Sequence, residues 1–273
     1  MVCRSRATLP TQVPDRQVSM QQLHLLSYNI QAGISTRQYR EYVTKSWKHV
    51  LPHREHLPNL SRIASILRGY DFVGLQEVDA GSLRSGFVDQ TEYLAYHARF
   101  PHWYKQVNRN LGSLARHSNG VLSRVRPSEI IEYKLPGFPG RGAVVVELKT
   151  TDESILAVCI LHLALGRRAR RRQLDYIREL ATRYPYVVVM GDFNCDCESR
   201  ALKDLVANTD LRGLDCELKT FPSWYPRRSL DHILVSGNLR IIGIGVQVLD
   251  HSLSDHLPVS MKVALPKGVR LAT

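Results

Sequence analysis

The sequence predicts an α/β fold in one domain, and two observations support the class while a third supports the single domain. Short apolar runs with strand character recur along the 273-residue chain, and segments with helical spacing of apolar residues lie between them. Interleaved strands and helices are typical of α/β proteins. The chain contains no internal repeat, low-complexity block or Gly/Ser-rich linker. We therefore expect one domain over residues 20–273, preceded by a disordered tail at residues 1–19.

The expected strands are rich in Val, Ile and Leu, and several are apolar without interruption. A run such as YVVVM (186–190) has no polar face for water, which is typical of a strand buried on both faces. In chain order, the expected strands are 23–30, 71–78, 142–150, 155–163, 186–190, 230–236 and 258–265.

Three helices are expected between these strands, at about residues 57–68, 89–99 and 167–182. In the last of them, Leu174 and Ile177 lie three residues apart and Leu180 continues the same apolar face. Strands and helices therefore alternate over most of the chain.

Residues 31–56 form the irregular part of the chain. Its histidines, His49, His53 and His56, have the spacing of a helix face, but Pro52 interrupts such a helix. We therefore expect these histidines to serve surface or packing roles instead of binding a metal.

The composition indicates a globular protein with excess positive charge. Lys and Arg number 37 against 25 Asp and Glu, which gives a formal net charge of +12. Such a surface attracts polyanions or anionic membranes. Nucleic acid and anionic phospholipid are therefore both candidate partners.

The amino-terminal segment and the cysteines favour a cytoplasmic protein. Residues 1–22 lack the apolar stretch of a signal peptide, and no later run is long enough to span a membrane. The five cysteines share no repeated spacing, which argues against a disulfide framework and for a reducing compartment. Cys195 and Cys197 lack the second pair of ligands that a structural zinc site needs.

Polar side chains stand where the expected strands end. They are Asn29, Glu77, His162, Asp192, Asn194, Asp231 and the triplet Ser254–Asp255–His256. Taken singly, each is explained by a turn, a surface acid or a buried core histidine. Taken together, they put acids and amides where strands would otherwise stay buried. Ligands of open α/β sheets bind beyond the carboxyl ends of the strands, so we expect one site there.

These residue types suit phosphoester hydrolysis. A phosphodiester is anionic and repels nucleophiles, so its hydrolysis needs a hard cation, an activated water and a group that neutralises the leaving oxygen. Oxygen ligands such as Glu77, helped by Asp255 or Asp192, favour Mg²⁺ or Mn²⁺ over zinc. No nucleotide cofactor is expected, because GFPGRG at residues 137–142 lacks the Lys-Ser/Thr pair of a P-loop.

The motifs YNI, QEV, SNGVLSR, LHL, GDFN, LDHIL and SDH follow one another in an order that resembles the endonuclease/exonuclease/phosphatase, or DNase I-like, superfamily. The chain looks most like its small bacterial members, and the resemblance covers residues 20–266. It implies a four-layer α/β sandwich, in which two packed mixed β-sheets are flanked by helices and the site lies at one end. The superfamily includes DNase I, abasic-site endonucleases, neutral sphingomyelinases and inositol polyphosphate 5-phosphatases.

The resemblance assigns one group of residues to a metal ion and the attacking water. Glu77 and Asn29 match the metal ligands, and Asp255 matches a residue near a second metal position. Asp192 matches the residue that orients or deprotonates the water. The implied cofactor is Mg²⁺, with Mn²⁺ as an alternative.

A second group matches residues on the substrate phosphate. Asn194 matches a phosphate contact, and Asn119 matches a residue on the phosphate-binding side that supports the site. His256 would bind the scissile phosphate or protonate the leaving oxygen, with Asp231 accepting its other ring proton. A carboxylate in that position favours the charged imidazole. His162 would be a second imidazole on the phosphate.

Two departures from the superfamily motifs narrow the subgroup. Abasic-site endonucleases carry an acid two residues after the first Asn, where this chain has Gln31. Inositol phosphatases carry basic residues after GDxN, where this chain has Cys195–Glu198. Neither subgroup is therefore expected, and the motifs leave the substrate open.

Two basic segments are candidates for choosing the substrate. The first is an arginine run on the last expected helix, made of Arg167, Arg168, Arg170, Arg171 and Arg172. It is either a track for a polyanion or a solvated helix face. The second is the loop TFPSWYPRR (220–228), which suits stacking on unpaired bases, insertion into a lipid interface, or simple packing of Phe221 and Trp224.

We therefore expect a monomeric Mg²⁺-dependent phosphodiesterase, specifically a nuclease that cleaves DNA by attack of water on phosphorus. The alternative within the same superfamily is a hydrolase of phospholipids or phosphorylated small molecules. A protein that keeps the fold but only binds ligands is the third reading, and it is disfavoured because every expected catalytic position carries a competent residue.

Overall fold

The computed structural model describes residues 20–34, 38, 40, 56–137, 139–247 and 253–272. The first sheet contains β1 (Gln22–Asn29), β2 (Phe72–Asp79), β3 (His102–Asn110), β4 (Arg116–Ser123), β10 (Arg240–Val246) and β11 (Val259–Ala264). The second sheet contains β5 (Glu129–Lys134), β6 (Gly142–Lys149), β7 (Ile155–His162), β8 (Tyr186–Asp192) and β9 (Asp231–Val235). The helices are α2 (His56–Leu67), α3 (Gln90–Ala98), α4 (Arg167–Ala181) and α5 (Arg200–Ala207), with short 3-10 turns η1 (Gln31–Gly33) and η3 (Leu83–Ser85).

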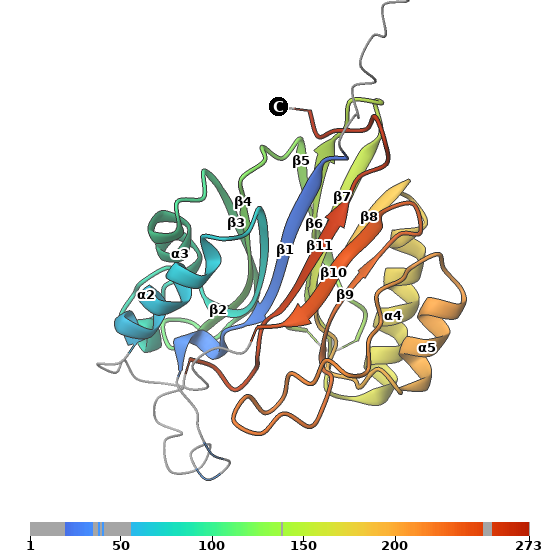
Figure 1. Cartoon of the computed structure of the whole chain (residues 1–273). Helices are drawn as coiled ribbons and strands as arrows, with labels where there is room; N and C mark the ends of the chain where they lie inside the picture. The colour runs from blue at the N-terminus through green and yellow to red at the C-terminus, as the bar shows by residue number, and fades with distance from the viewer. Residues whose placement is uncertain are drawn as a thin grey trace, which may run out of the picture.

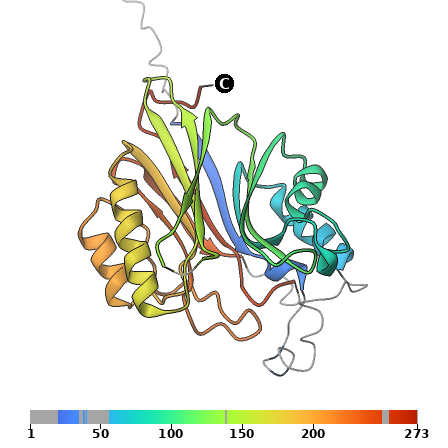
Figure 2. The ribbon, with the colours of Figure 1, turned by 180° about the vertical axis from the view of Figure 1, so that it is seen from behind.

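The two sheets pack face to face, and a pair of helices covers the outer face of each (Figure 1). The strand order is β10-β11-β1-β2-β4-β3 in the first sheet and β5-β6-β7-β8-β9 in the second. Helices α4 and α5 lie over the second sheet, as the view from behind also shows (Figure 2). This is the four-layer α/β sandwich that the resemblance implied.

Three apolar cores hold the four layers together. Leu25 and Val188 belong to the core between the two sheets. Their chain neighbours point the other way, so Leu26 packs under α2 and α3, and Val189 shares a core with Ile177 of α4. Successive side chains of a strand face opposite sides, and here both sides are covered. This arrangement explains why the central strands are apolar without interruption.

The helices and central strands predicted from sequence are confirmed, with ends that differ by at most two residues. The missed elements are β3, β4, β5, β10 and α5. Strands β3, β5 and β10 lie at sheet edges, where one side is open to water. Polar residues accordingly interrupt β3 and β5, and two glycines interrupt the apolar run of β10.

The structure describes only some of the residues for which a tail or a packing role was predicted. The predicted tail at residues 1–19, His49 and His53 lie outside the described residues. His56 is buried at the start of α2, where its Nε2 lies 2.6 Å from Nε2 of Gln90, in agreement with a packing role. Across the described residues, no helix combines the length and the apolar character needed to cross a membrane.

The topology brings the ends of several strands together at one end of the sandwich. Strand β1 is parallel to β2 in the first sheet, and β7 is parallel to β8 in the second. Strands β6 and β9 run antiparallel to these neighbours, so each of them begins where β7 and β8 end. The polar strand ends of both sheets therefore meet at the end that is lowest in Figure 1.

Candidate active site

The strand ends of the second sheet place His162, Asp192 and Asp231 side by side. In the sheet register, His162 of β7 pairs with Asp192 of β8, which pairs with Asp231 of β9. Asn29 ends β1 in the first sheet, and its Nδ2 donates a hydrogen bond to Oδ2 of Asp192 at 3.1 Å. The Asp192 carboxylate therefore lies where the two sheets meet.

The GDFN motif forms a tight turn that fixes this carboxylate. Gly191 has φ 153°, and a Cβ there would lie 1.9 Å from the carbonyl oxygen of Leu161, so only glycine fits. Asn194 has φ 52°, a left-handed conformation that Asn tolerates. Its backbone N–H donates to Oδ1 of Asp192 at 2.8 Å, and its Nδ2 donates to the carbonyl oxygen of Leu163 at 2.9 Å. Asn194 thus orients Asp192.

His256, Asp231 and Asp192 form what we call the acidic half of the site, and all three are buried. Nδ1 of His256 lies 2.8 Å from Oδ2 of Asp231, and its Nε2 lies 3.9 Å from Oδ2 of Asp192. Oδ2 of Asp231 also accepts a hydrogen bond from Oγ1 of Thr220 at 2.6 Å. Burial opposes the imidazolium, but Asp231 and Asp192 outweigh it and raise the pKa of His256 well above its usual value. His256 is therefore cationic.

The pKa of Asp192 is shifted toward neutrality. Burial raises it to about 7, and the negative charges of Asp231 and Glu77 act in the same direction. The positive charge of His256 opposes the shift. A carboxylate with such a pKa can accept a proton near neutral pH.

The SDH triplet is tied to the end of β1. Oγ of Ser254 donates to the carbonyl oxygen of Asn29 at 2.7 Å, and the N–H of His256 donates to Oγ of Ser254 at 3.2 Å. The N–H of Ser223 donates to the carbonyl oxygen of Asp255 at 2.7 Å. These contacts hold Asp255 and His256 against the first sheet and the loop that precedes β9.

Glu77 reaches the site from an irregular part of β2. The register between β2 and β4 shifts beside it, and Glu77 has φ 56°. Such a bulge redirects a side chain and is frequent next to active sites. The Glu77 side chain is 36% exposed, and its Oε1 lies 3.8 Å from Nε2 of His162. Burial and the charge of Asp255 raise its pKa, against the hydrogen bond from Asn29.

His162 and Arg141 form what we call the basic half of the site. Nε2 of His162 lies 3.4 Å from Oδ2 of Asp192. Burial and the positive charge of Arg141 nevertheless hold the pKa of His162 well below its usual value, so this imidazole is neutral. Arg141 is half-buried at the start of β6 and interacts with Glu77 and Asp192, although burial lowers its pKa.

Arg141 is a residue of this candidate site that the sequence analysis did not identify. The site was expected beyond the carboxyl ends of the strands, whereas Arg141 precedes the amino end of β6, which is antiparallel to β7. A signal was present, since an arginine stood directly before the buried run GAVVVEL. Recognising it required knowing that β6 runs antiparallel to β7.

Asn119 lies behind the site. It is buried, and its Nδ2 donates to the carbonyl oxygen of Gly142 at 3.2 Å and to Oε1 of Gln106 at 3.4 Å. These bonds link β3 and β4 of the first sheet to β6 of the second. The geometry agrees with a supporting role for Asn119.

The oxygen donors on the Glu77 side fit a hard divalent cation. Glu77 and Asn29 interact, and Asp255 is close enough for its charge to raise the pKa of Glu77. A cation between these carboxylates would relieve that repulsion, and all-oxygen ligand sets suit Mg²⁺ or Mn²⁺. Asp192, Asp231 and His256 also have ligand atoms within 4.8 Å of one another. In that second group, however, His256 and Asp231 already bond to each other.

Residues 26–256 match the Endonuclease/Exonuclease/phosphatase family. The chain belongs to this family. No curated protein matches the chain.

Solved structures share the family fold at low sequence identity. An endonuclease/exonuclease/phosphatase from Beutenbergia cavernae is 17% identical with a TM-score of 0.70, over 90% of this chain and 72% of that chain. A mannosyl-6-phosphatase from Bacteroides thetaiotaomicron is 17% identical with a TM-score of 0.66, over 89% and 100% of the two chains. D. rerio TDP2 complexed with single strand DNA product is 15% identical with a TM-score of 0.65, over 89% and 98%.

The arginine run of α4 does not converge on the strand-end residues of the candidate site. Arg170 turns back, and its Nη1 donates to the carbonyl oxygens of Ala164 and Leu165 at 3.2 and 2.8 Å. Arg171 lies in the groove between α4 and α5. Arg167, Arg168 and Arg172 are exposed on the outer helix layer.

The loop 220–228 divides into a packed part and an exposed part. The ring of Phe221 lies 4.9 Å from that of His256, centre to centre, so Phe221 packs on the acidic half. Tyr225 is 59% exposed, and the guanidinium of Arg227 lies 4.2 Å from its ring centre. The expected packing role is thus seen for Phe221, while Trp224 is half-buried.

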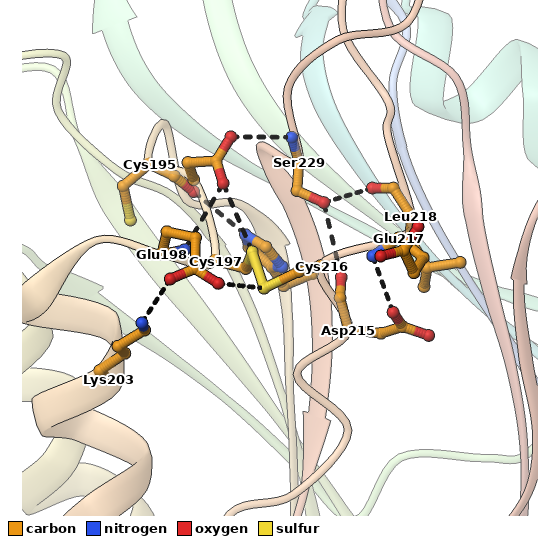
Figure 3. The surroundings of a disulfide bond; sticks show 11 residues. Cys195, Cys197, Glu198, Lys203, Asp215, Cys216, Glu217, Leu218 and Ser229 are labelled. Carbon is orange, nitrogen blue, oxygen red and sulfur yellow. Dashed lines mark hydrogen bonds and ion pairs between the residues drawn. A yellow bond between two sulfur atoms is a disulfide. The ribbon is translucent and has the colours of Figure 1, made fainter.

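A disulfide joins the segment after GDFN to the segment before Thr220 (Figure 3). It links Cys197 to Cys216, whose Cα atoms lie 5.4 Å apart. The expectation of no disulfide is wrong for this pair, because a separation of 19 residues carries no sign that the chain folds back across α5. The cysteines therefore give no support to the predicted reducing compartment.

Proposed function

We propose that the chain is a Mg²⁺-dependent phosphodiesterase that hydrolyses DNA. The observation that carries this proposal is the Asp192 carboxylate, whose Oδ2 lies 3.4 Å from Nε2 of His162 and 3.9 Å from Nε2 of His256. A buried carboxylate between a neutral and a cationic imidazole suits the activation of a water beside an anionic substrate.

Asp192 would orient the attacking water and take its proton. Its Oδ1 is already occupied by the N–H of Asn194 and its Oδ2 by Nδ2 of Asn29, so the carboxylate cannot rotate away from the water. Proton transfer from water to this carboxylate generates the nucleophile that attacks phosphorus.

His256 would bind a phosphate oxygen and protonate the leaving oxygen. Asp231 accepts the bond from Nδ1 and keeps the ring charged, which leaves Nε2 for the substrate. Arg141 and the neutral His162 would donate hydrogen bonds to the other phosphate oxygens. Asn194 would complete the phosphate contacts by donating the second N–H of its Nδ2, whose other N–H is bonded to the carbonyl oxygen of Leu163.

The family and the donor set together support a divalent cation. Glu77, Asn29 and Asp255 would hold Mg²⁺, which supplies Lewis-acid stabilisation of the charge that develops on the phosphoryl group. The net charge of +12 and the fold likeness to TDP2 bound to single strand DNA product support nucleic acid as the substrate.

A phosphorylated small molecule is the second candidate substrate. The fold likeness to a mannosyl-6-phosphatase supports it, and so does a compact polar cavity of about 190 Å³ beside Glu77. Both candidates use the same water, metal and phosphate residues, and they differ only in what surrounds the phosphate.

The test is cleavage of supercoiled plasmid and of a single-stranded oligonucleotide with Mg²⁺, alongside phosphate release from mannose 6-phosphate. EDTA and His256→Ala should abolish cleavage. His24→Ala, at the opposite end of β1, is the matched control and should retain it. Phosphate release from the sugar without DNA cleavage would replace the first candidate by the second, and inertness toward all three would reject both.

A further inference from the structure

A cavity of about 190 Å³ lies beside the catalytic residues, where the two sheets approach each other. Its lining includes Glu77, Asn108, Arg109, His117, Arg141 and His162. Glu77, His162 and Arg141 belong to the site described above. The other side chains come from β3 and β4, so the cavity extends the site toward the edge of the first sheet.

Close packing of β3 on β6 builds this cavity. A Cβ on Gly142 would lie 2.2 Å from Oδ1 of Asn108 and 2.5 Å from Oε1 of Gln106, so the side-chain ends of these β3 residues lie directly against the start of β6. As a result, Asn108 and Arg109 stand next to Arg141 although they are distant in sequence. The cavity is therefore a product of the sandwich and not of a local motif.

The wall of the cavity carries two arginines whose charge is only partly balanced, because Glu77 and Asp192 act on Arg141 from beyond ion-pair distance. Within the part of the chain that the structure describes, neither Arg109 nor Arg141 has a carboxylate within ion-pair distance. Arg84 nearby differs, because its Nε lies 2.5 Å from Oδ2 of Asp79. The charges of Arg109 and Arg141 are thus available to a ligand.

The two histidines of the cavity stay neutral beside these arginines. Burial, Arg84, Arg109 and Arg141 together lower the pKa of His117 to about 4, against the opposing charge of Asp79. His162 is neutral for similar reasons. Both rings can therefore serve as hydrogen-bonding groups, while the arginines provide the charge that favours an anion.

We propose that this cavity is a subsite for a second phosphate of the substrate, covalently linked to the phosphate that reacts at Asp192. The subsite rests on the proposed phosphoesterase function and names its substrate class. A guanidinium matches two phosphate oxygens at once, and the amide of Asn108 adds a donor. The second phosphate belongs either to the next nucleotide of a strand or to a small bisphosphate.

The experiment compares two chromogenic substrates that differ only in the second phosphate. They are thymidine 5′-(4-nitrophenyl phosphate) and the same compound phosphorylated at the 3′ oxygen. Wild type should hydrolyse the phosphorylated compound with the lower KM. Arg109→Gln should raise that KM about tenfold, the loss expected for a charged hydrogen bond, with kcat unchanged. It should leave the singly charged substrate unaffected.

Arg183→Gln is the matched control, because Arg183 is exposed beyond the far end of α4 and its loss changes net charge equally. If Arg109→Gln and Arg183→Gln raised the KM for the phosphorylated substrate equally, the effect would come from the net charge of the protein, and the proposal would be overturned. Equal KM values for the two substrates in wild type would overturn it as well. The same KM comparison is made with mannose 6-phosphate and mannose 1,6-bisphosphate. A lower KM for the sugar bisphosphate alone would assign the second phosphate to a small molecule, and a lower KM for the phosphorylated nucleotide alone would assign it to a nucleic-acid strand.

Direct binding keeps this test independent of turnover. If wild type with Mg²⁺ hydrolyses none of these compounds, the proposed function fails, and calorimetry with thymidine 3′,5′-bisphosphate and thymidine 5′-phosphate still measures the subsite. Tighter binding of the bisphosphate that Arg109→Gln abolishes would support the subsite. Equal binding of both nucleotides would reject it.

Discussion

The acidic and basic halves of the site contain the same type of side chain in opposite charge states. His256 and His162 are both buried, and both lie within 4 Å of Oδ2 of Asp192. Asp231 bonds to His256 and raises its pKa, whereas Arg141 faces His162 and lowers its pKa. Burial lowers the pKa of both imidazoles, and the neighbouring charges therefore decide which one is cationic.

This difference separates two tasks within one site. A cationic imidazole can neutralise and protonate an oxygen that leaves, while a neutral imidazole beside an arginine can donate its single N–H to a phosphate oxygen without carrying a charge. The carboxylate of Asp192 lies between them. Substitutions that change one half and spare the other test this division.

The largest expected effect comes from Asp192, which both halves share. Asp192→Asn keeps the shape of the side chain but removes the proton acceptor, so kcat should fall on the order of 10³-fold. The measurement is single-turnover cleavage of an oligonucleotide with Mg²⁺, with thermal unfolding as the check on folding. A folded variant that retains the wild-type rate would exclude Asp192 as the base.

Asp231→Asn should disable the acidic half alone. The pKa of His256 is raised in the folded protein, so its proton, and the activity that needs it, are lost as pH rises through that pKa. Without the Asp231 charge the pKa falls, so the alkaline limb of the pH–rate profile should move to lower pH. Near neutral pH, kcat should fall by about 10²-fold.

Thr220→Val serves as the control for this prediction. It removes the hydroxyl bonded to Oδ2 of Asp231 but leaves the charge. Its alkaline limb should not move to lower pH. An unshifted profile for Asp231→Asn would contradict the role assigned to Asp231.

The disulfide tests how far the acidic half depends on a covalent link. Cys216 precedes Thr220 by four residues, and the bond closes a loop with a sequence separation of 19. Cys216→Ser should therefore lower the free energy of unfolding by about 3 kcal/mol. Chemical denaturation with and without dithiothreitol measures the effect. A variant as stable as oxidised wild type, or one that dithiothreitol weakens further, would contradict this role of the bond.

The smallest expected effect concerns His117 on the basic side. Its pKa is about 4 in the folded protein and near 6.5 when unfolded. Between these values the unfolded chain binds the extra proton, so acidification favours unfolding. His117→Gln should reduce this acid sensitivity by less than about 1.4 kcal/mol per pH unit, because water reaches the half-buried ring. Parallel unfolding curves for wild type and variant between pH 4 and 6.5 would contradict the shift.

The sequence alone determined the elements that are apolar on both faces. The runs around Val158 and Val188 have no polar side, so they can only be strands inside a layered fold, and the structure has them there. The polar residues that interrupt such runs were recognisable for the same reason. Asn29, Glu77, His162 and Asp192 stand where an acid or amide is costly unless it has a partner or a function.

Only the tertiary structure decided which distant residues meet. The sequence did not reveal β3 and β4, which carry Arg109 and His117. It revealed β6, which follows Arg141, but not that β6 runs antiparallel to β7. Cys197 and Cys216 are paired by the way the chain folds back after α5. Strand direction and sheet packing are long-range properties, since they depend on which strands are neighbours. The local pattern of side chains indicates which residues are buried and therefore identifies candidate site residues. The charge states of His162 and His256, and the residues that line the cavity, depend instead on neighbours that only the fold brings together.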